Sequence, residues 1–140
     1  MTTTINTKLE LELVSTLVVR TKRGRYSGFV ASPRLRPKFL AVLHSFSDFD
    51  PRCTVRLSRS EDSSRGYLRE LRRRGAGPNA YLISTHVDLD GITVPLEHAV
   101  NEVHGIQDGT IIICTPALAY YEGECGYRFI LASRPLGRAR

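Results

Sequence analysis

Apolar and polar residues alternate along the first part of the chain in a way that is typical of β-strands. Residues 9–13 (Leu-Glu-Leu-Glu-Leu) repeat with a period of two, which predicts a half-buried strand. The apolar stretches 17–21 and 26–31 flank the basic residues 22–25, where Gly24 can form a tight turn, so they predict a β-hairpin. The N-terminal region is therefore expected to consist mainly of β-structure.

The middle of the chain contains one well-delimited helix. The apolar run 38–46 fits either a short helix or a strand, and residues 53–59 predict a further strand. A helix is predicted over residues 65–74, because Ser63 and Ser64 are both good N-caps and the glycines and proline of residues 75–78 end it.

The second half predicts a helix between two buried strands. The helix is expected between Thr93, a good N-cap, and Gly105, because apolar residues recur between them with helical spacing. Residues 80–85 and 109–115 are apolar runs typical of central strands. A strand–helix–strand order predicts that the two strands are parallel and joined by a right-handed crossover.

Together these elements predict an α+β fold in a single domain that covers residues 1–133. The chain closes with a predicted hairpin formed by residues 118–122 and 127–132. We therefore expect a mixed β-sheet with an N-terminal hairpin, two short helices and a C-terminal hairpin. The segment 75–78 is a candidate internal joint, and residues 134–140 are expected to form a flexible basic tail.

Charge is distributed unevenly along the chain. The 140 residues include 20 Lys and Arg against 14 Asp and Glu, a formal net charge of +6. Basic residues dominate as far as Arg74, whereas residues 75–126 contain seven acidic residues and no Lys or Arg. The basic half could face an acidic partner, or it could pair with the acidic half of another copy. Alternatively, the two halves could neutralise each other within the fold.

Two groups of basic residues are candidate anion-binding sites. Four Arg side chains of the predicted helix 65–74 share one face, which suits contacts with phosphates. The predicted turn 22–25 provides the second group, with Tyr26 beside it as a platform for stacking on a base. Helix faces rich in Arg are also often merely solvated, and Tyr26 can equally belong to the core. The candidate nucleic-acid-binding residues are Lys22, Arg23, Arg25, Tyr26, Arg65, Arg69, Arg72 and Arg73.

A second hypothesis places a catalytic site at one edge of the sheet. If strands 80–85 and 109–115 are parallel, their C-terminal ends meet there and bring His86 and Asp88 near Cys114. An imidazole, a carboxylate and a thiol are the groups that a nucleophilic hydrolase or transferase uses. In the alternative interpretation, Cys114 is a small buried residue and Asp88 belongs to a tight turn.

The cysteine pattern and the polar N-terminus indicate in which cellular compartment the protein is expected. The three cysteines, at positions 53, 114 and 125, form no CxxC pair, so neither a disulfide framework nor a structural zinc site is predicted. We expect no metal and no cofactor, because the common nucleotide and metalloprotease motifs are absent. The polar N-terminus does not resemble a signal peptide, and no apolar run approaches the roughly 18 residues of a spanning helix. These features predict a cytoplasmic protein without a membrane segment.

The leading functional hypothesis is a small, basic binding protein without catalytic activity. Its Arg-rich N-terminal half would contact nucleic acid or another acidic partner. The first alternative is a small hydrolase or transferase that uses His86, Asp88 and Cys114. The second alternative is a subunit of a homo- or hetero-oligomer in which the basic and acidic halves of neighbouring copies meet, and high salt would dissociate such an assembly.

Overall fold

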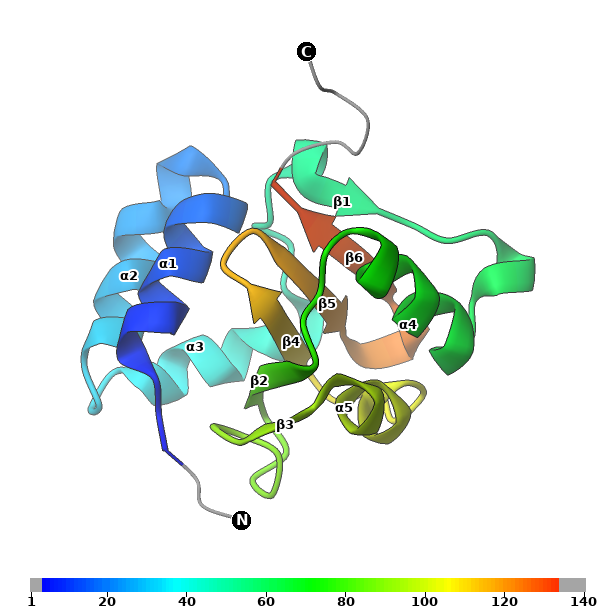
Figure 1. Cartoon of the computed structure of the whole chain (residues 1–140). Coiled ribbons are helices and arrows are strands. Elements are labelled where there is room, and N and C mark those ends of the chain that lie inside the picture. Colours follow the sequence, from blue (N-terminus) through cyan, green and yellow to red (C-terminus); the bar gives the residue numbers. More distant parts are fainter. Residues whose placement is uncertain (1–3, 134–140) are drawn as a thin grey trace.

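The computed structural model describes residues 4–133, which form one antiparallel sheet between two layers of helices (Figure 1). The strands are β1 (Thr54–Val55), β2 (Asn79–Ser84), β3 (Thr93–Pro95), β4 (Thr110–Thr115), β5 (Leu118–Glu122) and β6 (Arg128–Ala132). The helices are α1 (Thr7–Leu17), α2 (Arg23–Ala31), α3 (Arg36–Val42), α4 (Ser64–Arg73) and α5 (Leu96–Val103). The strand order is β1-β6-β5-β4-β2-β3. The prediction of a single α+β domain is confirmed, and the predicted tail at 134–140 lies outside the described residues.

The predicted strand at residues 9–13 is wrong, because this segment lies in α1. The buried positions of α1 are Glu10, Leu13, Val14 and Leu17, which have helical rather than alternating spacing. The side chain of Asn6 caps the helix by accepting a hydrogen bond from the backbone N–H of Leu9 at 3.1 Å. The alternation of Leu and Glu concealed this pattern, since one of the glutamates is itself part of the buried face.

The predicted N-terminal hairpin is also wrong, because its second arm is α2. Gly24 lies in the first turn of this helix rather than in a hairpin turn, and Tyr26 and Val30 are buried one helical turn apart. Residues 38–46 continue as α3 and a short 3₁₀ helix, Leu43–Ser45. Of the predicted strand 53–59, only the two residues of β1 pair with the sheet, where they form an edge strand.

The second half of the chain matches its predicted elements more closely, but β2 and β4 are antiparallel. Tyr81 pairs with Ile113 and Ser84 with Thr110, which excludes the predicted parallel crossover and makes the sheet fully antiparallel rather than mixed. The missed element is β3, which returns alongside β2 before the chain enters α5. Thr93 therefore begins a strand, and the N-cap of α5 is Pro95.

Both faces of the sheet are buried, and each supports its own hydrophobic core. Successive residues of β2 point to opposite sides: Tyr81 and Ile83 pack with α1–α3, whereas Leu82 packs with α4 and α5. This double burial explains why β2 and β4 are almost continuously apolar.

The proposed internal joint at 75–78 is the end of α4 and the approach to β2. Gly75 has a positive φ of 106°, and the backbone N–H of Ala76 donates to the carbonyl of Leu71 at 3.0 Å. This geometry closes the helix in the manner of a glycine C-cap. The segment connects two elements of the same domain.

Candidate anion-binding surface

The sheet separates the two groups of basic residues that the sequence analysis identified. Tyr26, at the start of α2, belongs to the core on the α1–α3 side of the sheet. Tyr67 of α4 belongs to the core on the opposite side. Figure 1 shows these two helices in different layers, so their cations do not form one continuous surface.

Helix α4 presents the more strongly basic face. Ser63 caps the helix through the backbone N–H of Gly66 at 3.0 Å, and Tyr67 and Leu71 anchor its inner side. The outer side carries four exposed side chains, those of Arg65, Arg69, Arg72 and Arg73. This amphipathic pattern is the one that the sequence predicted.

Two of these four arginines have acidic partners. Arg73 donates to Glu70 at 3.1 Å, and this hydrogen bond lowers the pKa of the Glu70 carboxyl against the opposing effect of burial. Arg72 lies 3.8 Å from Glu97 of α5, and both side chains are more than half exposed. Within residues 4–133, neither Arg65 nor Arg69 forms an ion pair. These two residues, one helical turn apart, are therefore the most available cations of the face.

The basic group at the start of α2 is less available. Arg23 donates from Nε to the carbonyl oxygen of Val18 at 2.8 Å, and the Arg25 guanidinium lies 5.7 Å from the centre of the Phe29 ring. Tyr26 is only 4% exposed, and its hydroxyl donates to Asp48. Desolvation, helped by this hydrogen bond, raises the pKa of Tyr26 to about 12. The prediction that Tyr26 is a stacking platform is corrected, because its ring is buried in the core.

The structure adds two exposed arginines next to β1 that sequence reasoning did not include in the site. The side chain of Arg52 is 88% exposed, although it pairs with Asp50 at 2.9 Å. The guanidinium carbon of Arg56 lies 4.5 Å from the centre of the Tyr127 ring. The sequence around residue 56 does not predict this contact, because Tyr127 is distant in sequence and comes close only through the pairing of β1 with β6.

A small pocket opens beside Arg56. Its volume is about 170 Å³, and its aromatic walls come from Phe46, Phe49, Tyr127 and Phe129. Phe46, Phe49 and Phe129 are nearly buried, so the accessible ring of this pocket is that of Tyr127. One accessible ring beside one cation is chemically suited to a planar, negatively charged ligand.

The three residues of the alternative catalytic site do not come together. His86 and Asp88 are neighbours in the β2–β3 turn, where the backbone N–H of Asp88 lies 3.3 Å from Nδ1 of His86. Cys114 lies four residues along β4 from Thr110, which pairs with Ser84 at the His86 end of β2. That spacing corresponds to about 13 Å along the strand. Burial also raises the pKa of the Cys114 thiol to about 12, which keeps it protonated at neutral pH.

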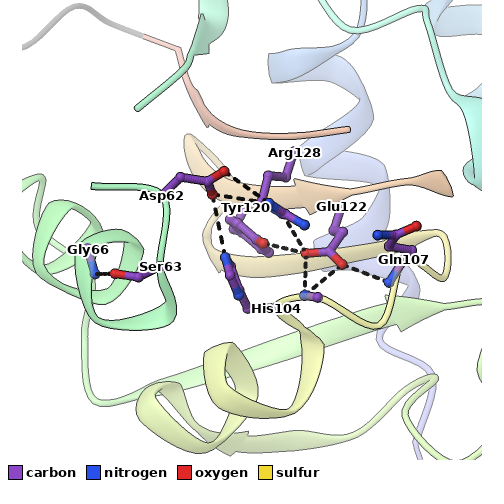
Figure 2. Close-up of polar contacts among 9 residues, drawn as sticks. Asp62, Ser63, Gly66, His104, Gln107, Tyr120, Glu122 and Arg128 are labelled. Atoms are coloured by element: carbon purple, nitrogen blue, oxygen red, sulfur yellow. Dashed lines mark hydrogen bonds and ion pairs between the residues drawn. The ribbon is translucent and has the colours of Figure 1, made fainter. Parts of the chain in front are cut away.

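A buried carboxylate, Glu122, organises the turn that follows α5 (Figure 2). It accepts hydrogen bonds from the backbone N–H groups of Gly105 at 2.9 Å and Gln107 at 2.7 Å. The hydroxyl of Tyr120 donates to it at 2.6 Å, and Nε of Arg128 donates at 3.2 Å. Since the Glu122 side chain is fully buried and all its contacts are internal, we assign it a structural role.

Asp62 extends this network toward the surface. Figure 2 shows its carboxylate between Arg128 and His104, at 3.1 Å from Nη1 of Arg128 and 3.5 Å from Nε2 of His104. The adjacent Ser63 caps α4 through Gly66. The start of the basic helix is thereby fixed to α5 and β6.

A second buried network joins the opposite side of the sheet. Arg36 donates to Glu10 at 2.9 Å and to Asp90 at 2.6 Å. The hydroxyl of Tyr81 donates to Glu10 at 2.7 Å, and the backbone N–H of Ser84 donates to Asp90 at 3.0 Å. Each charged group is paired, so we assign this network a structural role as well.

The basic and acidic halves of the chain partly neutralise each other within one molecule. Asp90 pairs with Arg36 and Glu97 lies near Arg72, so both pairs join the two halves of the sequence. Glu122, a third acidic residue of the second half, is buried against Arg128. Among the exposed arginines of residues 51–74, Arg56, Arg65 and Arg69 form no ion pair within residues 4–133.

The described part of the chain contains no metal-binding cluster. Within residues 4–133, no group of three or more His, Cys, Asp or Glu side chains is arranged to hold an ion. In the same part of the chain, no helix combines the length and the hydrophobicity needed to cross a membrane. Comparison with protein-family models, with curated proteins and with solved structures gave no match to this chain.

Proposed function

We propose that this protein binds nucleic acid through the exposed arginines of residues 51–74. The observation that carries the proposal is the outer face of α4, where Arg65 and Arg69 are exposed and form no ion pair within the described residues. Guanidinium groups are well suited to phosphate oxygens, because their planar fork can donate two parallel hydrogen bonds. The inner side of α4 is anchored in the core, so these side chains project from a fixed support.

The neighbouring residues extend the basic surface along the chain. Arg52, Arg56 and Arg59 are all exposed; Arg52 precedes β1, and the other two lie between β1 and α4. A polyanion that contacts several of these residues releases bound counterions, which makes its affinity steeply dependent on salt. The proposal does not include Tyr26 or Arg23, because both side chains already form hydrogen bonds within the fold.

The test is a pair of charge-reversed variants titrated with labelled oligonucleotides by fluorescence anisotropy over a range of salt concentrations. Arg65→Glu with Arg69→Glu changes the proposed surface. Arg34→Glu with Lys38→Glu makes the same change of charge at exposed positions around α3, in the other helical layer. Losing two phosphate contacts should lower the slope of log affinity against log salt by about 1.4 for a single strand. The control pair should keep most of the parent slope.

Two results would contradict the proposal. If the parent protein binds neither single-stranded nor double-stranded oligonucleotides at low salt, the basic surface serves another partner, such as an acidic protein. If both variant pairs weaken binding equally, the effect reflects net charge alone and not the α4 face.

We further propose that the protein works in the cytoplasm. All three cysteines are free thiols, among them the exposed Cys125, which suits a reducing compartment. Cell fractionation would test this, and recovery of the protein outside the cytoplasmic fraction would contradict it.

A further inference from the structure

We infer that the pocket beside Arg56 holds one base of a single-stranded nucleic acid, with the nucleotide phosphate at the Arg56 guanidinium. This inference rests on the proposed function and deepens it, since it names the form of nucleic acid that the surface selects. The ligand that this pocket would recognise is a planar aromatic ring that carries an anionic group.

The first support is the construction of the pocket walls. Four aromatic residues line a space of about 170 Å³, and among them Tyr127 exposes its ring whereas Phe46, Phe49 and Phe129 form the nearly buried floor. Base stacking on aromatic side chains is the sequence-tolerant mode by which proteins hold single strands. A space of this size suits one ring system and is smaller than the roughly 300 Å³ of a typical drug-sized site.

The second support is the presentation of Tyr127. The residue is 48% exposed, although the other five tyrosines of the chain are buried. The preceding turn places Cys125 and Gly126 at positive φ values of 62° and 72°, so the chain bends sharply before β6. The ring then packs edge-on against Phe129, with centroids 5.5 Å apart and planes at 90°. An aromatic side chain is thus held in place while much of its surface faces solvent.

The third support is the position of Arg56. Its guanidinium carbon lies 4.5 Å from the centre of Tyr127 and 5.8 Å from the centre of Phe129. Within residues 4–133 it forms neither an ion pair nor a side-chain hydrogen bond, so its N–H groups are available to a ligand. A cation held by two rings beside an aromatic pocket matches the phosphate that accompanies a stacked base.

The pocket should also distinguish a single strand from a duplex. The bases of a duplex are stacked on one another, so none can enter a side-chain pocket without being extruded from the helix. The outer face of α4 contacts phosphates, which both forms present. The pocket is therefore the part of the surface that should discriminate between them.

The experiment compares single-stranded and duplex oligonucleotides of equal length on pocket variants of the full chain. Tyr127→Ala should weaken single-strand binding about 5- to 140-fold, the range expected for the loss of one stacked base. Tyr127→Phe should retain the parent affinity, because it keeps the ring. Ile106→Ala is the matched control, since Ile106 is a large apolar side chain exposed to 41% outside the pocket. Duplex affinity should be unchanged in all three variants.

A second arm uses uridine monophosphate as the probe, followed by NMR chemical shifts of the protein. The nucleotide should shift the resonances of Thr54 and Tyr127, and Arg56→Gln should weaken this response. Uridine, which lacks the phosphate, should bind more weakly than the nucleotide. Phenyl phosphate shares the ring and the anion, so a response equal to that of the nucleotide would assign the pocket to aromatic anions in general and overturn the choice of a base.

The outcomes distinguish this inference from the function on which it rests. Single-strand binding that depends on Arg65 and Arg69 but not on Tyr127 would overturn the pocket and leave the α4 surface standing. Absence of any oligonucleotide binding would overturn the proposed function and, with it, the assignment of a strand to the pocket. Loss of folding in Tyr127→Ala would be recognised by circular dichroism, and the result would then be decided by Arg56→Gln.

Discussion

Replacing Glu122 by glutamine should strongly destabilise the fold. The carboxylate is fully buried and accepts hydrogen bonds from two backbone N–H groups, from Tyr120 and from Arg128. A glutamine side chain retains one acceptor oxygen, but its amide group would face donors that require an acceptor. Arg128 would at the same time lose its buried counter-charge and keep only the more exposed carboxylate of Asp62.

The size of the effect follows from the number and kind of lost contacts. Removing one partner of a buried ion pair costs about 3–5 kcal/mol. Two charge-assisted hydrogen bonds, at about 1.5–3 kcal/mol each, give a similar figure. For a chain of this length we take a melting temperature that falls by about 3 °C per kcal/mol, so the variant should melt about 9–15 °C below the parent.

The assay is urea denaturation followed by circular dichroism, with thermal melting as a second measurement. With a slope of about 2 kcal/mol/M, the midpoint should fall by about 1.5–2.5 M urea. Glu124→Gln is the control, because it makes the same chemical change two residues away at an exposed position, and it should alter stability by less than about 0.5 kcal/mol. If the free energy of unfolding of Glu122→Gln lies within about 1 kcal/mol of the parent value, the charge of Glu122 does not stabilise the fold.

Two further sets of measurements test the packing and the buried phenols. Gly109→Ala should destabilise by about 1–3 kcal/mol or more, because its Cβ would lie 2.5 Å from the backbone carbonyl carbon of Leu43, whereas Gly28→Ala meets nothing within 4 Å and should stabilise α2 by about 0.5–1 kcal/mol. Urea titrations of the two variants decide this, and equal effects would contradict the packing. Three phenols, those of Tyr26, Tyr67 and Tyr121, have a pKa raised from 10.0 to about 12, and the largest cause is desolvation by burial. The fold therefore favours their protonated forms, and this stabilisation should be complete below pH 10 and be lost as the pH rises toward 12. A free energy of unfolding that stays constant over this interval would show that the phenols are not buried in solution.

Local sequence patterns predicted the elements whose stabilising signals are themselves local. Helix α4 was predicted correctly because Ser63 and the glycine at 75 mark its two ends and its apolar residues share one face. The strands β2, β4, β5 and β6 were predicted because their apolar runs are continuous and bounded by turn residues. In each case the information lies within the segment.

The incorrect predictions involve contacts with distant residues. Glu10 can occupy the buried face of α1 because Arg36 and Tyr81 satisfy its carboxylate, and nothing near residue 10 announces either partner. The direction of β4 depends on β3, whose three residues are too few to give a periodic signal. The predicted catalytic site depended on that direction, which is why His86 and Cys114 lie apart.

The candidate anion-binding surface was predictable only in part for the same reason. The Arg face of α4 follows from helical spacing alone. The pocket beside Arg56 cannot be derived in this way, since its walls come from segments that meet only through the pairing of β1 with β6. Sequence alone indicated the charges but not the aromatic surface next to them.

The pairing of the first strand with the last has a consequence for the order of events during synthesis. Thr54 lies opposite Leu131, so the β1 edge has no partner while the ribosome is still translating the residues between them. Such contacts between distant parts of a chain form late in folding. Helix α4 can present its arginines earlier, but Tyr127 and Phe129 reach the pocket only when the C-terminal hairpin has emerged. A nascent or C-terminally truncated chain would therefore carry the charge of the surface without its pocket, and under the proposed function it could not yet distinguish a single strand from a duplex.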